Sequence, residues 1–155
     1  MAKYNYHEKK EKTAAYRTEV SPVVIDGIYE QILRKMIVEK KFLDPTYTAK
    51  RLAEDLNTNT RYISATVNLR FQMNFSELVS SFRVREAIGM MTDRRLLDLT
   101  MGEIAEACGF ANRQSFYAAF FRMQGKTPLQ YKKDFLKKLE DAKKKKAEKR
   151  QQKKQ

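Results

Sequence analysis

The chain has 155 residues, of which 42% are hydrophobic, and its formal net charge is +13. This length allows one ordinary domain or two very small ones, and the low contents of glycine and proline favour long helices. The single cysteine, Cys108, and the single histidine, His7, exclude an internal disulfide and provide no set of zinc ligands. We therefore expect an all-α protein with no metal ion and no cofactor.

The positive charge is unevenly distributed along the chain. From Lys132 onward, twelve lysine and arginine residues accompany four acidic ones, whereas residues 21–131 contain fifteen and twelve. The total charge therefore describes mainly the C-terminal tail, and an inference of nucleic-acid binding has to come from the folded part. The sequence has neither an export signal nor an apolar run long enough to span a membrane, so we expect a cytoplasmic protein with no membrane partner.

The N-terminal third predicts a polar arm followed by one long helix. Residues 1–20 lack apolar periodicity and are expected to form a flexible arm. Pro22 then opens a helix that should run to about Lys40, because apolar residues recur at spacings of three and four: Val24, Ile28, Ile32, Leu33, Met36 and Ile37. Pro45 breaks this helix, and Thr48 can cap the next one.

Three further helices are predicted between residues 49 and 92. The first, "AKRLAEDL", is short, and Asn57 follows it where a left-handed residue would end a helix. The next should begin near Asn59 and turn Ile63, Val67 and Phe71 inward. A longer helix then carries the apolar residues Phe75, Leu78, Val79, Phe82, Ala87, Ile88 and Met91.

The C-terminal part predicts three more helices. Thr100 and Glu103 fit a capping box, so a helix should begin at Met101, and Gly109 supplies the positive φ of a tight exit. The next helix should begin near Asn112, and the last one after Thr127 with Pro128 in its first turn. The expected buried residues of the first two are Ile104, Ala105, Cys108, Phe116, Phe120 and Met123.

The chain contains an internal repeat. "RLAEDLNTNTRYISATV" and "EIAEACGFANRQSFYAAF" match in pattern, with one extra residue in the second copy. Each copy reads as a short helix, a tight turn and a second helix, which is a helix-turn-helix. The small residues Ala53 and Ala105 fall where the two helices of each copy should approach most closely.

Helical phase places polar residues on the outer face of the second helix in each copy. With Phe116 and Phe120 inward, the outward residues of the second copy are Arg113, Gln114, Tyr117 and Phe121; in the first copy they are Arg61, Ser64, Ala65 and Asn68. Arginine and glutamine can make bidentate hydrogen bonds to base edges in the major groove. For Phe121 two interpretations stand, contact with a thymine methyl group or packing against the last helix, and the second is favoured.

The stretch "MGEIAEACGFANRQSFYAAFFRMQGKTPLQYKK" resembles the second helix-turn-helix of the AraC/XylS family of bacterial transcription regulators. The stretches "YTAKRLAEDLNTNTRYIS" and "FSELVSSFRVREAIGMM" resemble the first unit and the connecting helix of that family, so the resemblance covers roughly residues 23–135. The resemblance implies an all-α, homeodomain-like fold of seven helices, with two helix-turn-helix subdomains joined by a long linker helix. It also implies DNA contacts at family positions that fall on Arg61, Ser64, Ala65, Arg113, Gln114, Tyr117 and Ala118.

This chain departs from the family pattern at three positions. Asn57 and Gln72 stand where family members often have glycine, and Val67 stands at a position that is usually aromatic. We expect a flexible polar arm over residues 1–20, a double helix-turn-helix DNA-binding domain over 21–136 and a lysine-rich C-terminal tail over 137–155. Two helix-turn-helix units on one chain also allow binding as a monomer. The resemblance to the short, single-domain members implies that activity is set by the amount of protein.

The sequence therefore predicts a sequence-specific, DNA-binding transcription regulator, associated with the nucleoid, whose two recognition helices read successive major-groove segments. The family resemblance implies that it is an activator that contacts RNA polymerase. Its expected partners are double-stranded DNA and RNA polymerase, and no small-molecule effector is evident. An enzyme is not expected, because no nucleophile, base and stabiliser can be assembled. The alternatives are a non-specific architectural DNA binder driven by the cationic tail, and a protein-interaction module. The tail itself reads either as a solvated helix end or as a phosphate-binding segment.

Overall fold

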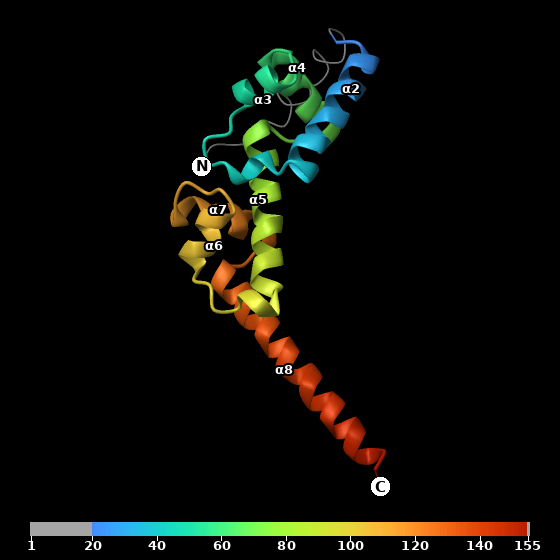
Figure 1. Cartoon of the computed structure of the whole chain (residues 1–155), viewed down its shortest axis with the longest axis vertical. Coiled ribbons are helices and arrows are strands. Elements are labelled where there is room, and N and C mark those ends of the chain that lie inside the picture. The colour runs from blue at the N-terminus through green and yellow to red at the C-terminus, as the bar shows by residue number, and fades with distance from the viewer. Residues whose placement is uncertain (1–19, 155) are drawn as a thin grey trace. The chain divides into compact units, whose positions relative to one another are not determined.

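The computed structural model describes residues 20–154, and its regular structure over that range is entirely helical. The predicted arm lies outside the described residues except for Val20, and His7 lies outside them as well. Seven α-helices follow one another along the described chain (Figure 1): α2 Pro22–Leu33, α3 Ala49–Asp55, α4 Thr60–Thr66, α5 Phe75–Thr92, α6 Met101–Ala107, α7 Arg113–Gln124 and α8 Pro128–Gln152. The all-α prediction is confirmed.

Four short helical segments of other types complete the chain. Two are π-helical turns that continue an α-helix, η1 (Arg34–Val38) after α2 and η3 (Val67–Phe71) after α4. The other two, η2 (Lys41–Leu43) and η4 (Arg94–Leu96), are 3₁₀ turns. A π turn holds more residues than an α turn and rotates the side chains that follow it.

The first helix buries a slightly different stripe from the one predicted. Its buried residues run through Ile25, Ile28, Ile32 and Met36 at spacings of three and four. The predicted members Val24 and Ile37 flank that stripe and are 41% and 58% exposed. The prediction was wrong for these two because they lie about 90° or more from the centre of the buried face at 3.6 residues per turn.

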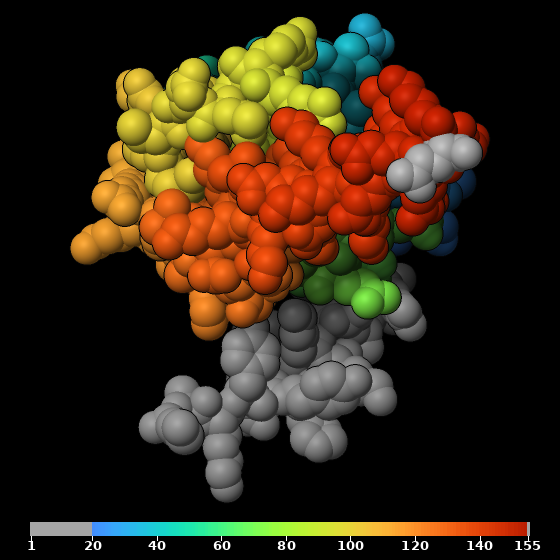
Figure 2. All heavy atoms as spheres, turned by 90° about the horizontal axis from the view of Figure 1, so that it is seen from below, coloured from blue at the N-terminus to red at the C-terminus, as the bar shows by residue number. Residues whose placement is uncertain are grey.

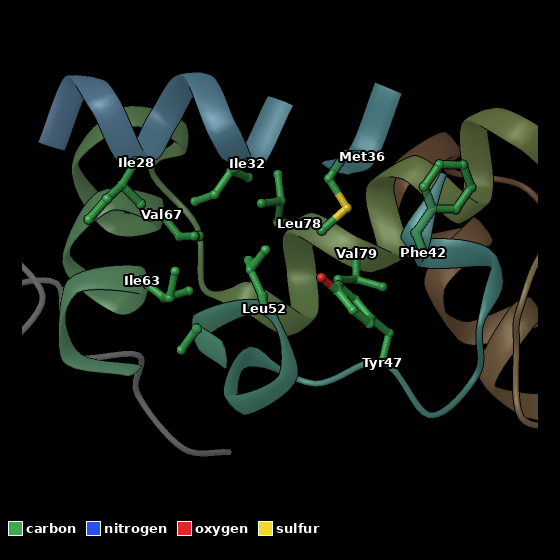
Figure 3. Packing of buried hydrophobic residues seen from close by; sticks show 11 residues of the cluster. Ile28, Ile32, Met36, Phe42, Tyr47, Leu52, Ile63, Val67, Leu78 and Val79 are labelled. Atoms are coloured by element: carbon green, nitrogen blue, oxygen red, sulfur yellow. The ribbon is translucent and has the colours of Figure 1, made fainter. Parts of the chain in front are cut away.

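The described residues form two compact units, and the boundary between them falls between Arg83 and Val84. In the first unit, apolar side chains from α2, α3, α4 and α5 point toward one another (Figure 3): Ile28, Ile32, Leu52, Ile63, Leu78 and Val79, joined by Met36, Phe42, Tyr47, Ala53 and Val67. The Arg83 side chain donates to the carbonyl oxygens of Phe42 (2.7 Å) and Asp44 (3.0 Å). These bonds tie the segment between η2 and α3 to α5.

The second unit has its own core, built around the C-terminal half of α5. That half contributes Val84, Ala87 and Met91, and α6, α7 and the turn between them contribute Met101, Ile104, Ala105, Cys108, Phe110, Phe116, Ala119 and Phe120. The ring of Phe120 meets Tyr131 of α8 edge-on, with 5.5 Å between ring centroids. Met123, predicted to be inward, is 39% exposed instead, because Phe116, Ala119 and Phe120 already fill the inner face of α7.

The internal repeat extends to the backbone hydrogen bonds that end the first helix of each copy. The Asn57 and Thr58 amides donate to Glu54 and Ala53, and the Gly109 and Phe110 amides donate to Glu106 and Ala105 in the same way. Both helix ends are therefore Schellman motifs with a left-handed residue, Asn57 at φ 51° and Gly109 at φ 87°. The predictions for these two positions are confirmed.

The second helix of each copy is bounded by an equivalent pair of residues. Asn59 caps the start of α4 and Asn112 caps the start of α7, each with its side-chain oxygen on the amide three residues later. Left-handed residues close both helices, Gln72 at φ 58° after η3 and Gly125 at φ 71° after α7. Equivalent residues in this part of the two copies are thus 53 positions apart.

The same offset makes α8 the counterpart of α5. Asn74 caps α5 by accepting from the Glu77 amide, and Thr127 caps α8 by accepting from the Gln130 amide. The helix α8 continues as a helix through Gln152, so the predicted start of the tail at residue 137 lies within it. Its side chains beyond Leu139 are exposed, and the end of the helix projects from the second unit (Figure 1).

Candidate nucleic-acid interface

The helix α7 presents two chemically different faces. Its buried face consists of Phe116, Ala119 and Phe120. The opposite face carries the predicted contact residues Arg113, Gln114 and Ala118, which are exposed, and Tyr117, which is half-buried. Since the Asn112 cap fixes where the helix begins, it also fixes which residues reach the outer face. The structure thus brings the four residues predicted for the second unit together on one surface.

The side chains of Arg113 and Tyr117 hold each other one helical turn apart. The Arg113 guanidinium donates to the Tyr117 hydroxyl oxygen over 3.1 Å, and its carbon lies 5.0 Å from the centre of the tyrosine ring. The ring itself is fixed by an edge-on contact with buried Phe116, at 5.8 Å between centroids. Because the hydroxyl is neutral, this arrangement orients the guanidinium without cancelling its charge.

Phe121 extends the exposed face of α7 by a further turn. It is 57% exposed, so the favoured interpretation that it packs against the last helix is wrong. The reason is that the neighbouring residue Phe120 takes the position facing α8, where it meets Tyr131. Gln114, Ala118 and Phe121 follow one another at spacings of four and three, which places them in one row along the outer surface.

The helix α4 offers a narrower surface. Arg61 is exposed, while Ser64 and Asn68 are partly buried. The Asn68 side-chain amide donates to the Ser64 carbonyl over 2.8 Å, so it caps a backbone acceptor within its own helix. Of the residues predicted for the first unit, Arg61 and Ser64 therefore lie on the outer face with side-chain groups that can reach a ligand.

Ala65, predicted to point outward, is fully buried. It forms a small cluster with Val20 and Ile25, because α2 packs along the side of α4. Its counterpart in the second copy, Ala118, is exposed. The same residue type therefore has opposite environments in the two copies, and the cause is the flanking helix α2. Val20, which the sequence placed at the end of the flexible arm, is buried by the same packing.

One exposed residue of α4 and one of α7 were not among the predicted contacts. Thr60 opens α4 at the position equivalent to Arg113, and Ser115 stands in the first turn of α7. The first turn of a helix also carries unpaired backbone amides, which suits contact with phosphate. The repeat offset of 53 would have found Thr60 from the sequence.

Carboxylates in the same units neutralise several other basic side chains. Arg70 of η3 pairs with Asp26 of α2, and Lys126 pairs with Asp134 over 2.9 Å. The hydrogen bond from Lys126, followed by one from Gln130, holds the pKa of Asp134 below its usual value. These cations serve the fold, in contrast to Arg113, whose partner is the uncharged tyrosine.

Comparison with known proteins gives one family. The family model described as a helix-turn-helix domain, of the AraC type, matches residues 52–134. The uncharacterized HTH-type transcriptional regulator YtdP of Bacillus subtilis is 31% identical over 85 residues, which are 55% of this chain. The aligned part spans 11% of that relative's length, so the chain covers only a small part of it.

Solved structures agree with this family in fold. The C-terminal domain of AraT, a response regulator from Geobacillus stearothermophilus, superposes with a TM-score of 0.59 at 25% identity and covers 75% of this chain and 88% of its own. The C-terminal domain of the two-component response regulator yesN from Fusobacterium nucleatum gives a TM-score of 0.57 at 26% identity, covering 66% and 97%. The family is one of DNA-binding domains of regulators and not a class of enzymes.

The described residues include no helix that is both long and apolar enough to cross a membrane. The match covers both helix-turn-helix units, from Leu52 in α3 to Asp134 in α8. The chain belongs to the AraC-type helix-turn-helix family of DNA-binding transcriptional regulators.

Proposed function

We propose that this protein recognises a specific DNA sequence, with α4 and α7 as recognition helices in successive major-groove segments. The observation that carries the proposal is the outer face of α7, where Arg113, Gln114, Tyr117 and Ala118 stand opposite a fully apolar inner face. The major groove admits an α-helix, and each base pair presents a distinct donor and acceptor pattern there. A chain with this function works on chromosomal DNA, in the cytoplasm.

In the second unit, we assign base readout to Arg113 and Gln114. A guanidinium can bind guanine O6 and N7 together, and a glutamine amide can bind adenine N6 and N7. The contact with Tyr117 supports this assignment for Arg113, because a side chain oriented before binding loses less conformational freedom on the DNA. Exposed Phe121 suits an apolar contact with a thymine methyl group.

In the first unit, we assign base or phosphate contact to Arg61 and Ser64. The role assigned to Asn68 is to hold the backbone of this face through its hydrogen bond to the Ser64 carbonyl. The burial of Ala65 narrows the surface of α4 that a base could touch. We therefore expect the first unit to contribute less sequence preference than the second and a larger share of phosphate contacts.

The test is a comparison of specific and random DNA. Selection of bound duplexes from a random pool, read by sequencing, gives the preferred site. Arg113→Ala and Gln114→Ala should each weaken binding to that site by about 1–3 kcal/mol and leave binding to random duplex nearly unchanged. Each change should also relax the preference at one base position.

The matched control is Arg122→Ala, which removes the same charge from the last turn of the same helix. That change should affect specific and random DNA alike. If Arg113→Ala also lowers both affinities equally, the protein is a non-specific architectural binder and the proposal fails. If the wild-type chain does not bind duplex DNA at low salt, the helix pairs belong to a protein-interaction module.

We further propose that binding activates transcription through contact with RNA polymerase. This part rests on the resemblance to the AraC/XylS family. A reporter gene placed downstream of the selected site should give more transcript when the wild-type protein is expressed and no increase with Gln114→Ala. A fall in transcript with the wild-type protein would identify a repressor.

A further inference from the structure

The second half of α8 has no apolar partner. After Leu139 its side chains are exposed, yet the chain stays helical to Gln152, and the Lys153 amide still donates to the Lys149 carbonyl over 3.2 Å. Residues 140–154 contain eight lysine and arginine residues and three acidic ones. Figure 2 shows the side chains of α8 (orange to red) standing outward on the face turned to the viewer.

The charges of this segment are sorted onto two sides of the helix. Five bases follow one another at spacings of three, three, one and three, and we call them the basic stripe: Lys143, Lys146, Lys149, Arg150 and Lys153. At 3.6 residues per turn they fall within a sector of about 120°. The three acids, Glu140, Asp141 and Glu148, fall on the opposite side of the helix.

The acids accompany the lysines outside the stripe. Lys144 has Glu140 and Asp141 four and three positions before it and Glu148 four positions after it, and Lys145 has Asp141 and Glu148 at spacings of four and three. Such spacings place opposite charges next to each other on a helix surface. Within the stripe, Lys146, Lys149, Arg150 and Lys153 have only neutral or basic residues at those spacings. Lys143 is the one member with an acid at such a spacing, Glu140. The stripe is therefore mainly a surface of one sign, about 120° wide, and the other charges of residues 140–154 balance, with three bases and three acids.

We propose that the basic stripe binds the phosphate backbone of double-stranded DNA beside the sequence read by α7. The inference rests on the proposed binding of duplex DNA by the same chain. The first half of α8 packs on Phe120 of α7 through Tyr131, so the stripe is carried on the helix that braces the recognition helix. From Lys143 to Lys153 the helix rises about 15 Å, enough to face several successive phosphates.

The composition of the stripe favours a duplex over other polyanions. A membrane-surface helix needs a large apolar face opposite its charges, whereas the face opposite the stripe carries acids. Single-stranded nucleic acid is bound by aromatic side chains that stack on bases, and the last aromatic residue of the chain, Phe135, precedes the stripe. Lysine is a flexible, strongly hydrated point charge that suits phosphate contact without base readout.

The experiment compares two double variants of equal charge. Lys146→Gln/Lys149→Gln removes two bases of the stripe, and Lys144→Gln/Lys145→Gln removes two bases beside the acids. Glutamine and lysine have similar helix propensity, so circular dichroism should show the same helix content in both variants. Binding of the full chain to the selected site and to random duplex is then measured by fluorescence anisotropy at several salt concentrations.

The stripe variant should bind both duplexes about tenfold more weakly at low salt, with a slope of log affinity against log salt that is smaller by about 1.8. The ratio of specific to random affinity should stay at the wild-type value. The control variant should change the slope by less than half as much. Equal effects of the two variants would mean that total charge alone matters and would overturn the proposal.

Two further outcomes separate this proposal from the function on which it rests. If the wild-type chain shows no preference for a selected site, sequence-specific recognition fails, while the two lysine pairs can still be compared on random duplex. If the stripe variant keeps wild-type duplex binding and loses binding to vesicles of anionic phospholipid, the stripe faces a membrane and the proposal is overturned.

Discussion

Arg113 and Tyr117 form one unit on the surface of α7, with the guanidinium 3.1 Å from the hydroxyl oxygen and 5.0 Å from the ring centre. The hydrogen bond and the ring contact both hold the guanidinium against the same tyrosine. A four-residue spacing on a helix brings the two side chains together. The buried ring of Phe116 contacts the tyrosine ring edge-on and limits its movement.

This arrangement predicts different effects for two substitutions of Tyr117. Tyr117→Phe removes the hydrogen bond and keeps the ring, so affinity for the selected site should fall by no more than about 0.5–1 kcal/mol. Tyr117→Ala removes both and should cost about as much as Arg113→Ala, which is about 1–3 kcal/mol. In the Arg113→Ala background, Tyr117→Ala should add little. Full additivity of the two changes in a double-mutant cycle would show that tyrosine contacts DNA independently.

The two corner alanines should not tolerate a large side chain. Ala53 and Ala105 are buried, and their carbonyls accept the bonds that end α3 and α6. Ala53→Leu and Ala105→Leu should each lower the free energy of unfolding by about 1–3 kcal/mol through overpacking. Ala107→Leu, on the exposed side of α6, is the control and should be nearly neutral. Urea unfolding measures all three, and unchanged midpoints for the corner variants would show that the contact lies elsewhere.

Substitutions of the left-handed residues that follow η3 and α7 should change the free energy of unfolding in opposite directions. Gln72 has φ 58°, a region that is unfavourable for residues with a Cβ, so Gln72→Gly should raise the free energy of unfolding by about 0.5–1 kcal/mol. Gly125 has φ 71°, and an added Cβ would meet no atom within 4 Å. Gly125→Ala should therefore cost about 1 kcal/mol from the backbone alone. Thermal unfolding of both variants is the measurement, and a stabilised Gly125→Ala would contradict this account.

Asp93 should make stability depend on pH in the acid range. Hydrogen bonds from the Arg95 side chain and then from its amide lower the pKa of Asp93 from 3.8 to about 2. A carboxyl with a lowered pKa in the folded state stabilises the fold above its unfolded pKa, and this contribution is lost as the pH falls from about 4 toward 2. Asp93→Asn should thus be less stable than the wild type at pH 6, and the gap in urea midpoint should narrow by pH 3. A gap that stays constant would contradict the assignment, and Asp98→Asn controls for net charge.

Much of this fold can be predicted from local signals in the sequence. The caps Thr48, Asn59 and Thr100 and the left-handed Asn57 and Gly109 depend on neighbours within a few residues, so short-range rules locate them. The outward placement of Arg113 and Gln114 follows from the phase of a single helix packed on a single core. Whether these residues contact DNA remains a prediction.

The features that sequence reasoning missed depend on a second helix that packs against the one in question. The phase of α4 identifies the face toward Ile63 and Val67, but only the packing of α2 along its side explains why Ala65 is buried. The exposure of Phe121 similarly depends on which phenylalanine α8 meets. The π turns η1 and η3 change the direction in which the side chains point at the ends of α2 and α4. No short-range pattern in the sequence predicts these turns.

The correspondence between α5 and α8 also limits the number of helix-turn-helix units that can follow one another in this fold. Where α5 goes on to supply Val84, Ala87 and Met91 to the second core, the positions 53 residues later in α8 carry Lys137, Glu140 and Lys144. An additional helix-turn-helix with the same pattern as the second would find charge there in place of an apolar surface. Substituting valine, alanine and methionine at these three positions is therefore the first step in designing a chain with a third helix-turn-helix unit.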